Sequence, residues 1–120
     1  MKVQQFEDLV VWRKAKDLSV MVYRSSGGGR FSRDYALRDQ IRRAVVSVMS
    51  NVAEGFERYS RPEFRHFLSI ARGSASEVRS QLHLARELGY LTNQEHRQLH
   101  DQCGEVSRLL AALRASTTNG

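Results

Sequence analysis

Apolar residues recur every three or four positions in four long stretches of the chain, which is the period of a helix with one buried face. In the first stretch, Val11, Ala15, Leu18 and Val22 keep this spacing, while charged side chains occupy the other positions. The sequence contains a single proline, and only one cluster of glycines interrupts the pattern strongly. The pattern predicts an all-α fold whose first helix covers residues 8–24.

The glycine cluster lies in residues 25–30, which read Ser-Ser-Gly-Gly-Gly-Arg and have low helix propensity. A glycine-rich run before a helix can cradle phosphate. Here the spacing does not match a phosphate-binding loop, and no strand is predicted before it. We therefore interpret the run as a flexible connector and as the longest loop of the chain.

Helix-capping residues mark where the later helices begin. The second helix is predicted from residues 32–34 to Glu54, with the glycine that follows Glu54 placed to end it. The third begins at Ser60, which can form a capping box with Glu63, and continues until Gly89 stops it. This start is the best-defined helix boundary in the sequence.

Two further signals concern helix starts. Tyr59 directly precedes the N-cap of the third helix and is predicted to pack on Phe64 as a hydrophobic staple. Thr92 and Glu95 repeat the capping-box pattern and open the fourth helix.

Because the last two connections are only a few residues long, successive helices are predicted to be antiparallel neighbours in an up-down-up-down four-helix bundle. The bundle is assigned to residues 1–115, and residues 116–120 are predicted to be a disordered tail.

The third helix carries more apolar surface than one core requires. Ala71 and Ala75 belong to its inner face, whereas Ile70, Leu84 and Leu88 widen the apolar arc toward a second side. A second apolar side indicates a second packing partner, so we predict homo-oligomerisation. The alternative is that these residues are ordinary scattered surface apolars.

Length and cysteine content limit the possible classes of protein. The chain has 120 residues, enough for one domain, and its single Cys cannot form an internal disulfide. The N-terminal residues contain no uninterrupted apolar stretch typical of a signal peptide or a membrane span. We therefore expect a cytoplasmic protein that does not enter a membrane.

Positive charge is unevenly distributed along the chain. Lys2, Lys14 and Lys16 are the only lysines, so 16 of the 19 cationic residues are Arg, and the net charge is +6. Residues 30–89 carry eleven cations and seven anions, whereas residues 90–120 carry three of each. The excess favours an anionic partner, although genome composition and solubility explain it equally well. The basic surface is predicted to exclude the C-terminal quarter.

Several longer motifs carry a resemblance to a known family. Residues 40–91 contain the segments QIRRA, SNVAEG and ARGSASE, and residues 6–12 read FEDLVVW. These segments resemble the four-helix-bundle family encoded in intervening sequences of bacterial 23S ribosomal RNA genes, over most of the chain. Met49 stands where that family usually has proline, so we expect a straighter second helix here.

The resemblance implies a small pentameric helical barrel without enzymatic activity. It also implies a link to diversity-generating retroelements, because a related branch is their accessory protein and binds reverse transcriptase and nucleic acid. Residue spacing by itself does not distinguish five subunits from two or four.

Arginines recur every seven residues from the start of the third helix to its end. The row consists of Arg58, Arg65, Arg72, Arg79 and Arg86. Seven residues nearly complete two turns, so the four inside the helix form a stripe about 30 Å long that drifts by about 20° per step. We expect this stripe to point away from the apolar face and to track a phosphate backbone. The alternatives are a solvated face and ion pairs with a neighbouring subunit.

Three further Arg residues, Arg61, Arg42 and Arg43, complete the candidate nucleic-acid-binding set. Aromatic residues are interleaved with Arg in residues 56–65, a pattern that can stack unpaired bases. Because Tyr59 is already assigned to the staple, the Arg residues are the better candidates.

A polar ladder borders the apolar stripe of the second helix. It consists of Gln40, Arg43, Ser47, Asn51 and Glu54. Polar groups beside a core must find partners, and such a ladder can fix helix register or subunit orientation. We assign it, with Ile70 and Leu84, a structural or assembly role.

Metal and catalytic chemistry are not indicated. His96, His100 and Cys103 share one side of the fourth helix, but HRQLH lacks the Glu of a metalloprotease motif and no fourth donor is near. No spacing suggests a nucleophile and its base. We predict no metal, no cofactor and no enzymatic activity.

Two functions remain open. The first is an oligomeric bundle that binds RNA or DNA through its basic surface. The second is an assembly or adaptor subunit for a protein partner such as a reverse transcriptase, in which the same Arg residues pair with acids. A small hydrolase is disfavoured because no catalytic constellation is found.

Overall fold

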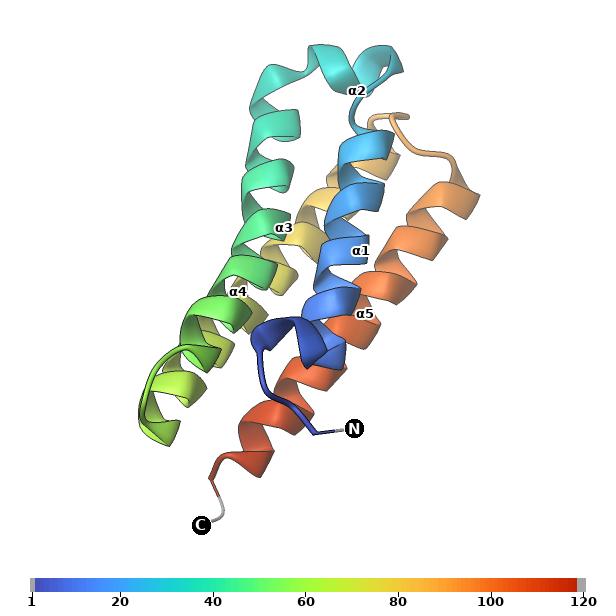
Figure 1. Ribbon diagram of the computed structural model, residues 1–120. Coiled ribbons are helices and arrows are strands. Elements are labelled where there is room, and N and C mark those ends of the chain that lie inside the picture. The colour runs from blue at the N-terminus through green and yellow to red at the C-terminus, as the bar shows by residue number, and fades with distance from the viewer. Residues whose placement is uncertain (1, 119–120) are drawn as a thin grey trace.

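The computed structural model describes residues 2–118, and in this range the chain forms helices and no strand. The elements are a 3₁₀ turn η1 (Phe6–Asp8), then α1 (Val10–Ser25), α2 (Gly29–Arg33), α3 (Tyr35–Phe56), α4 (Arg61–Glu87) and α5 (Asn93–Ser116). Figure 1 shows the long helices side by side along the molecule, with the short α2 at one end. The prediction of an all-α helical bundle is confirmed.

The apolar faces of the long helices meet in one core. Helix α3 packs against α1 and α4, and α5 packs against α4 and α1. The largest fully buried side chains include Leu18, Ile41, Leu68, Leu82, Leu99 and Leu110, which come from all four long helices. Burial of each such side chain contributes about 1.5–3 kcal/mol relative to exposure. The apolar stripes predicted from the sequence are the core.

The N-terminal region differs from the prediction in two places. Helix α1 begins at Val10 rather than at residue 8, because the Asp8 carboxylate accepts backbone N–H groups of the preceding turn, at 3.0 Å from Gln4. The predicted long loop is also interrupted by α2. Burial of Phe31, which stacks on Tyr90 with ring centroids 5.3 Å apart, orders this turn despite its poor helix propensity.

The glycine after Glu54 does not end its helix, and that prediction is wrong. Helix α3 continues to Phe56, and Gly55 is buried inside it. A Cβ at Gly55 would lie 2.7 Å from the Cβ of Phe67. The residue therefore permits close approach of α4 and does not serve as a helix stop. Met49 lies within the same unbroken helix.

The capping box of α5 is confirmed, that of α4 is present only in its Ser60 half, and the predicted staple is wrong. The Ser60 hydroxyl accepts the backbone N–H of Glu63 at 3.3 Å, and Thr92 forms a complete capping box at the start of α5. Tyr59, however, is fully exposed. Phe64 packs instead against Phe56 of α3, edge to face, with ring centroids 6.2 Å apart.

The end of the chain is only partly described. Helix α5 extends to Ser116, one residue beyond the predicted bundle, and Thr117 is buried. Residues 119–120 of the predicted tail lie outside the described residues, so the boundary at 115 stays a prediction. None of the described helices combines the length and the apolar character that a membrane span requires.

Candidate functional site

The arginine row of α4 lies along its seam with α5. At one end, Arg65 donates a hydrogen bond of 2.7 Å to the carbonyl of Thr117. At the other end, Nη1 of Arg86 lies 3.4 Å from Nδ1 of His96. Because the seven-residue spacing keeps the row in one line, Arg72 and Arg79 lie along the same seam. The row borders the core, so the expectation that it points directly away from the apolar face is wrong.

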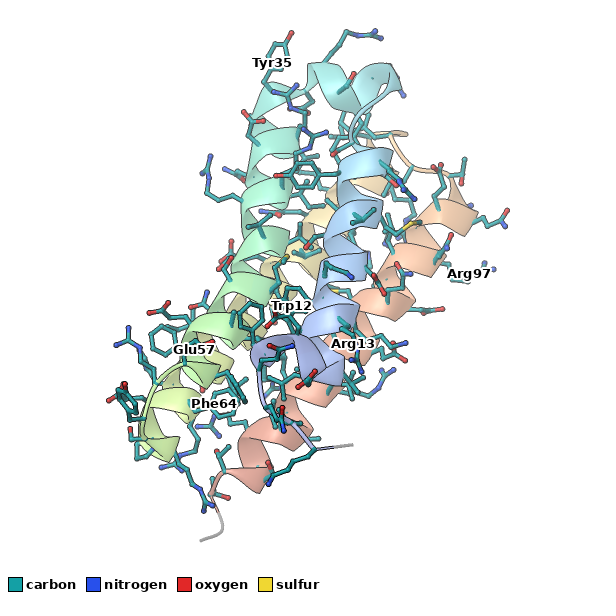
Figure 2. The ribbon with its side chains drawn as sticks, viewed as in Figure 1. Trp12, Arg13, Tyr35, Glu57, Phe64 and Arg97 are labelled. Carbon is teal, nitrogen blue, oxygen red and sulfur yellow. The ribbon has the colours of Figure 1, made fainter. Side chains whose placement is uncertain are left out.

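Helix α5 contributes further cations to this seam. Arg114 donates a hydrogen bond of 2.8 Å to the Ser69 hydroxyl of α4, and Arg97 lines a cavity together with Arg86. Figure 2 shows Arg97 extending outward from α5. We name this surface the cationic seam. It consists of Arg65, Arg72, Arg79 and Arg86 of α4 and Arg97 and Arg114 of α5.

The contribution of α5 corrects the expectation that the C-terminal quarter takes no part in the basic surface. Its charges sum to zero along the sequence, but two of its three anions serve other contacts. Glu95 caps its own helix, and Glu105 pairs with Lys14 of α1 at 3.2 Å. The third, Asp101, is exposed and follows Arg97 by about one turn. At this spacing Asp101 lies on the same helix face as Arg97.

Three histidines meet at one end of the seam. The ring centroid of His83 on α4 lies 4.9 Å from that of His96 and 5.4 Å from that of His100. Burial, followed by the charges of Arg86 and the other two histidines, lowers the pKa of His96 below its ordinary value of 6.5. His96 is therefore held in its neutral form at neutral pH.

The predicted grouping of His96, His100 and Cys103 does not form a metal site. The thiol of Cys103 is buried and lies 3.2 Å from the carbonyl of Ala75, and burial raises its pKa to about 11. A protonated thiol is a poor metal ligand. In residues 2–118, no group of three or more His, Cys, Asp or Glu side chains is arranged to hold a metal ion.

Arg58 and Arg61 lie at the start of α4, beyond the end of the seam. The Arg58 guanidinium donates to Glu54 at 2.6 Å and lies over the ring of Phe67, 5.0 Å from its centroid. These contacts hold the link between α3 and α4 and compete with phosphate for the side chain. Arg61, the first residue of α4, is exposed.

The structure does not bring Arg42 and Arg43 to the seam. Arg42 turns toward α1, where it donates to the Ser26 hydroxyl at 2.8 Å and stacks on Tyr23 at 4.5 Å from the ring centroid. Arg43 is exposed and lines a different cavity, between α3 and α4. Sequence proximity to the row therefore does not place them on the same surface.

The polar ladder of α3 faces α4 on the flank opposite the seam. The hydroxyls of Ser47 and Ser74 lie 2.9 Å apart, and Asn51 donates to the Ser47 carbonyl at 2.8 Å. Gln40 and Arg43 line a cavity of about 390 Å³ at the same flank. Within the ladder, the contact between Ser47 and Ser74 joins α3 to α4. The structural or assembly role of the whole ladder stays a prediction.

Comparison with known proteins identifies the family. Residues 7–112 match the family described as 23S rRNA-intervening sequence protein. The chain belongs to this family. The resemblance seen in the sequence motifs is thus confirmed. No curated protein matches the chain.

The fold of this intervening-sequence protein also occurs in a solved structure. That structure is of a protein with unknown function from the S23 ribosomal protein family of Bacteroides thetaiotaomicron VPI-5482. The two chains share 24% sequence identity with a TM-score of 0.80, and the match covers 88% of this chain and 98% of that chain. At this identity the likeness concerns the fold.

Two exposed apolar side chains lie on α4 of the intervening-sequence protein, and a third lies at its C-cap. Ile70 is 39% exposed, Leu84 49% and Leu88 41%. They are the residues whose positions widen the apolar arc in the sequence. Their exposure leaves them available to a second packing partner.

Sequence reasoning missed three members of the site, namely His83, Arg97 and Arg114. Their signal lies in the pairing of α4 with α5, which brings together residues that are separated along the chain. The sequence does place Arg97 close to two of the histidines, because it directly follows His96 and lies about one turn before His100.

Proposed function

We propose that this intervening-sequence protein binds nucleic acid, RNA or DNA, through the cationic seam. The observation that carries the proposal is a line of guanidinium groups from two helices, in which Arg72, Arg79 and Arg86 are exposed. The row from Arg65 to Arg86 is about 30 Å long, which is enough to contact several phosphates of a strand. Contacts of this kind engage the backbone, so binding is salt-sensitive and weakly selective for sequence.

Within the seam, Arg72, Arg79 and Arg86 are the main candidates, because all three are exposed. Arg65 contributes less, since it is partly buried and already bonded to Thr117. Arg61 is exposed and can extend the surface, whereas Arg43 lies at the opposite flank of α4. The contacts of Arg42 and Arg58 favour structural roles for them.

We further propose that the long helices form an antiparallel up-down-up-down bundle and that copies of it assemble through the flank of α3 and α4. Ile70, Leu84 and Leu88 supply exposed apolar surface there. The adjacent cavity contains a buried Oε1 atom of Gln81 that has no hydrogen-bond partner in the described part of the chain. The resemblance favours five copies. Because this flank lies opposite the seam on α4, assembly leaves the seam accessible.

A second candidate function is that of an adaptor for a protein partner such as a reverse transcriptase. The same exposed apolar residues favour it, because they can pack against a different protein as well as against a second copy. In either case the protein acts by binding and not by catalysis, without a cofactor and in the cytoplasm.

The proposal is tested by titrating labelled RNA, single-stranded DNA and duplex DNA with protein at low and moderate salt. We compare the wild type with the variant carrying Arg72→Glu and Arg79→Glu. The control carries Arg24→Glu and Arg33→Glu, which change the net charge by the same amount at exposed positions of α1 and α2.

We expect the seam variant to lose binding and the control to retain most of it. Absence of wild-type binding to all three ligands at low salt contradicts the proposal. If both variants lose the same affinity, binding depends on net charge and not on the seam, which also contradicts the proposal.

A further inference from the structure

A cavity of about 460 Å³ lies where the last turns of α4 meet the first turns of α5. Its lining consists of His83, Arg86, Asn93, His96, Arg97 and His100. The lining thus contains two guanidinium groups, three imidazoles and an amide, and no carboxylate among these side chains. Such a set favours an anionic guest.

The hydrogen-bond pattern of His96 shows which of its ring nitrogens carries the proton. Arg86 has only donors, so the contact of 3.4 Å makes Nδ1 of His96 the acceptor. The proton of the neutral ring is then on Nε2. That nitrogen is buried and has no partner in the described chain, and His96 as a whole is only 5% exposed. His96, which lines the cavity, therefore carries a buried N–H donor that no described group accepts.

A metal ion does not fit this arrangement. A metal requires a lone pair, whereas Nε2 of His96 carries hydrogen and Nδ1 is engaged by Arg86. An oxygen acceptor satisfies the N–H donor, and its negative charge is favourable to both guanidinium groups.

The start of α5 adds to the positive potential. Asn93 is the first residue of this 24-residue helix, and the N-terminal end of a helix carries partial positive charge. Glu95 of the same turn is bonded to the backbone N–H of Thr92 at 2.9 Å. On α4, Glu87 follows Arg86 and is exposed.

We propose that this cavity binds a phosphate monoester, and that in the nucleic-acid complex it receives the terminal phosphate of a strand. The second statement rests on the proposed function. Arg86 is the last Arg of the row, so a strand that follows the row arrives at the cavity. A terminal phosphate carries more negative charge than an internal diester, because its second proton is largely lost above a pH of about 6. The two charges suit a site with two guanidinium groups and three imidazoles.

A bound phosphate also changes the electrostatics around His96. Burial lowers the pKa of this ring first, followed by the charges of Arg86, His83 and His100. A phosphate in the cavity opposes the effect of those charges, so binding moves the pKa of His96 back up toward its ordinary value. The neutral ring already offers its Nε2–H donor, so binding does not require its protonation.

The test uses one internally labelled oligonucleotide in three forms, with a 5′-phosphate, with a 3′-phosphate, and with hydroxyls at both ends. Inorganic phosphate, followed by the NMR signals of the imidazole rings, is the separate probe for a free anion. We expect at least one phosphorylated form to bind about tenfold or more tightly than the hydroxyl form, as two charge-assisted hydrogen bonds predict.

Variants locate the effect. Arg86→Gln is expected to remove the preference for the phosphorylated end, and His83→Gln to reduce it. Arg72→Gln is the matched control, because it removes the same charge from the same row outside the cavity. It is expected to weaken all three forms equally and to keep the preference. Circular dichroism confirms that each variant is folded.

The outcomes separate this inference from the proposed function. Equal binding of the three oligonucleotide forms overturns the inference and leaves nucleic-acid binding intact. A preference that survives in Arg86→Gln also overturns it. Binding of inorganic phosphate and phosphorylated ends, with no binding of the hydroxyl form, supports the cavity and contradicts the seam as a backbone site.

Discussion

Gly55 and Gly73 illustrate how differently two helical glycines can act within one chain. At Gly55, an added Cβ would lie 2.7 Å from Phe67 and 3.0 Å from Phe64, so the two helices could not keep their separation. At Gly73 of α4 an added Cβ would meet nothing within 4 Å. Packing requires a glycine at position 55. At position 73 a residue of higher helix propensity would fit without a clash.

We therefore predict opposite effects of the same substitution. Gly55→Ala should lower the free energy of unfolding by about 1–3 kcal/mol, the usual cost of overpacking. Gly73→Ala should raise it by about 0.5–1 kcal/mol, because alanine orders more readily in a helix. Chemical denaturation of both variants measures the difference. Two changes of equal sign would contradict the close packing of α3 on α4.

Cys103 is the residue whose titration links stability to alkaline pH. Its pKa is raised by burial from an ordinary 9.0 to about 11 in the folded protein. Between these values the unfolded chain loses the thiol proton while the folded chain retains it, so stability should fall as the pH rises from 9 to 11. Denaturation across this range measures the fall, with Cys103→Ala as the comparison. A fall of the same size in Cys103→Ala would assign it to other groups.

At the scale of elements, caps and interhelical contacts determine how the helices are joined. Asp34 accepts the backbone N–H of Leu37 at 3.1 Å and so caps α3. It also accepts the Tyr90 hydroxyl at 2.9 Å, which ties the start of α3 to the connection between α4 and α5. One carboxylate therefore joins two parts of the chain that are distant in sequence.

The double role of Asp34 predicts a graded effect. Asp34→Ala should lower the free energy of unfolding by about 1–2 kcal/mol, because it removes a cap and leaves the Tyr90 hydroxyl without this partner. Tyr90→Phe keeps the cap and should cost about 1 kcal/mol or less. Thermal and chemical denaturation of the two variants test the order. A larger loss in Tyr90→Phe would show that the cap contributes little.

Local signals in the sequence were sufficient to predict the starts of α4 and α5. The caps at Ser60 and Thr92 depend on residues within one turn, so no tertiary contact is needed to recognise them. The exposed Tyr59 and the buried Gly55 could not be predicted this way, because their environments depend on how α3 meets α4. In both cases a tertiary contact overrides a local rule.

The sequence predicts that the arginines form one row, but it does not predict which other residues share their surface. Their spacing gives the line, and Arg72 lies only about 60° around the helix from the buried Ala75, which already places the row beside the core. The partners Arg97 and Arg114 required knowledge of which helix lies alongside α4. The sum of charges in a segment does not reveal this, since it ignores the side on which each charge lies.

At the scale of the whole molecule, the two flanks of α4 are assigned different tasks. The seam with α5 is cationic, and the flank toward α3 is polar and apolar. A protein with both surfaces can assemble through one and bind a polyanion through the other. We therefore predict that mutations on the flank toward α3 leave nucleic-acid binding unchanged and that mutations in the seam leave assembly unchanged.

Assembly is tested by light scattering after size-exclusion chromatography. Leu84→Glu introduces charge on the flank toward α3 and should reduce the wild-type oligomer to a smaller species. The matched control is Val20→Glu on α1, where the side chain is 41% exposed against 49% for Leu84. The control should keep the wild-type mass. A monomeric wild type would contradict the proposed assembly.

The central claim, that the seam holds phosphates, is tested most directly by the salt dependence of binding to single-stranded RNA. Each phosphate contact contributes about −0.7 to the slope of the logarithm of affinity against the logarithm of salt concentration. We predict that Arg72→Gln makes the slope shallower by roughly one contact, whereas Arg24→Gln on α1 leaves it unchanged. The same slope in the wild type and both variants would contradict the claim.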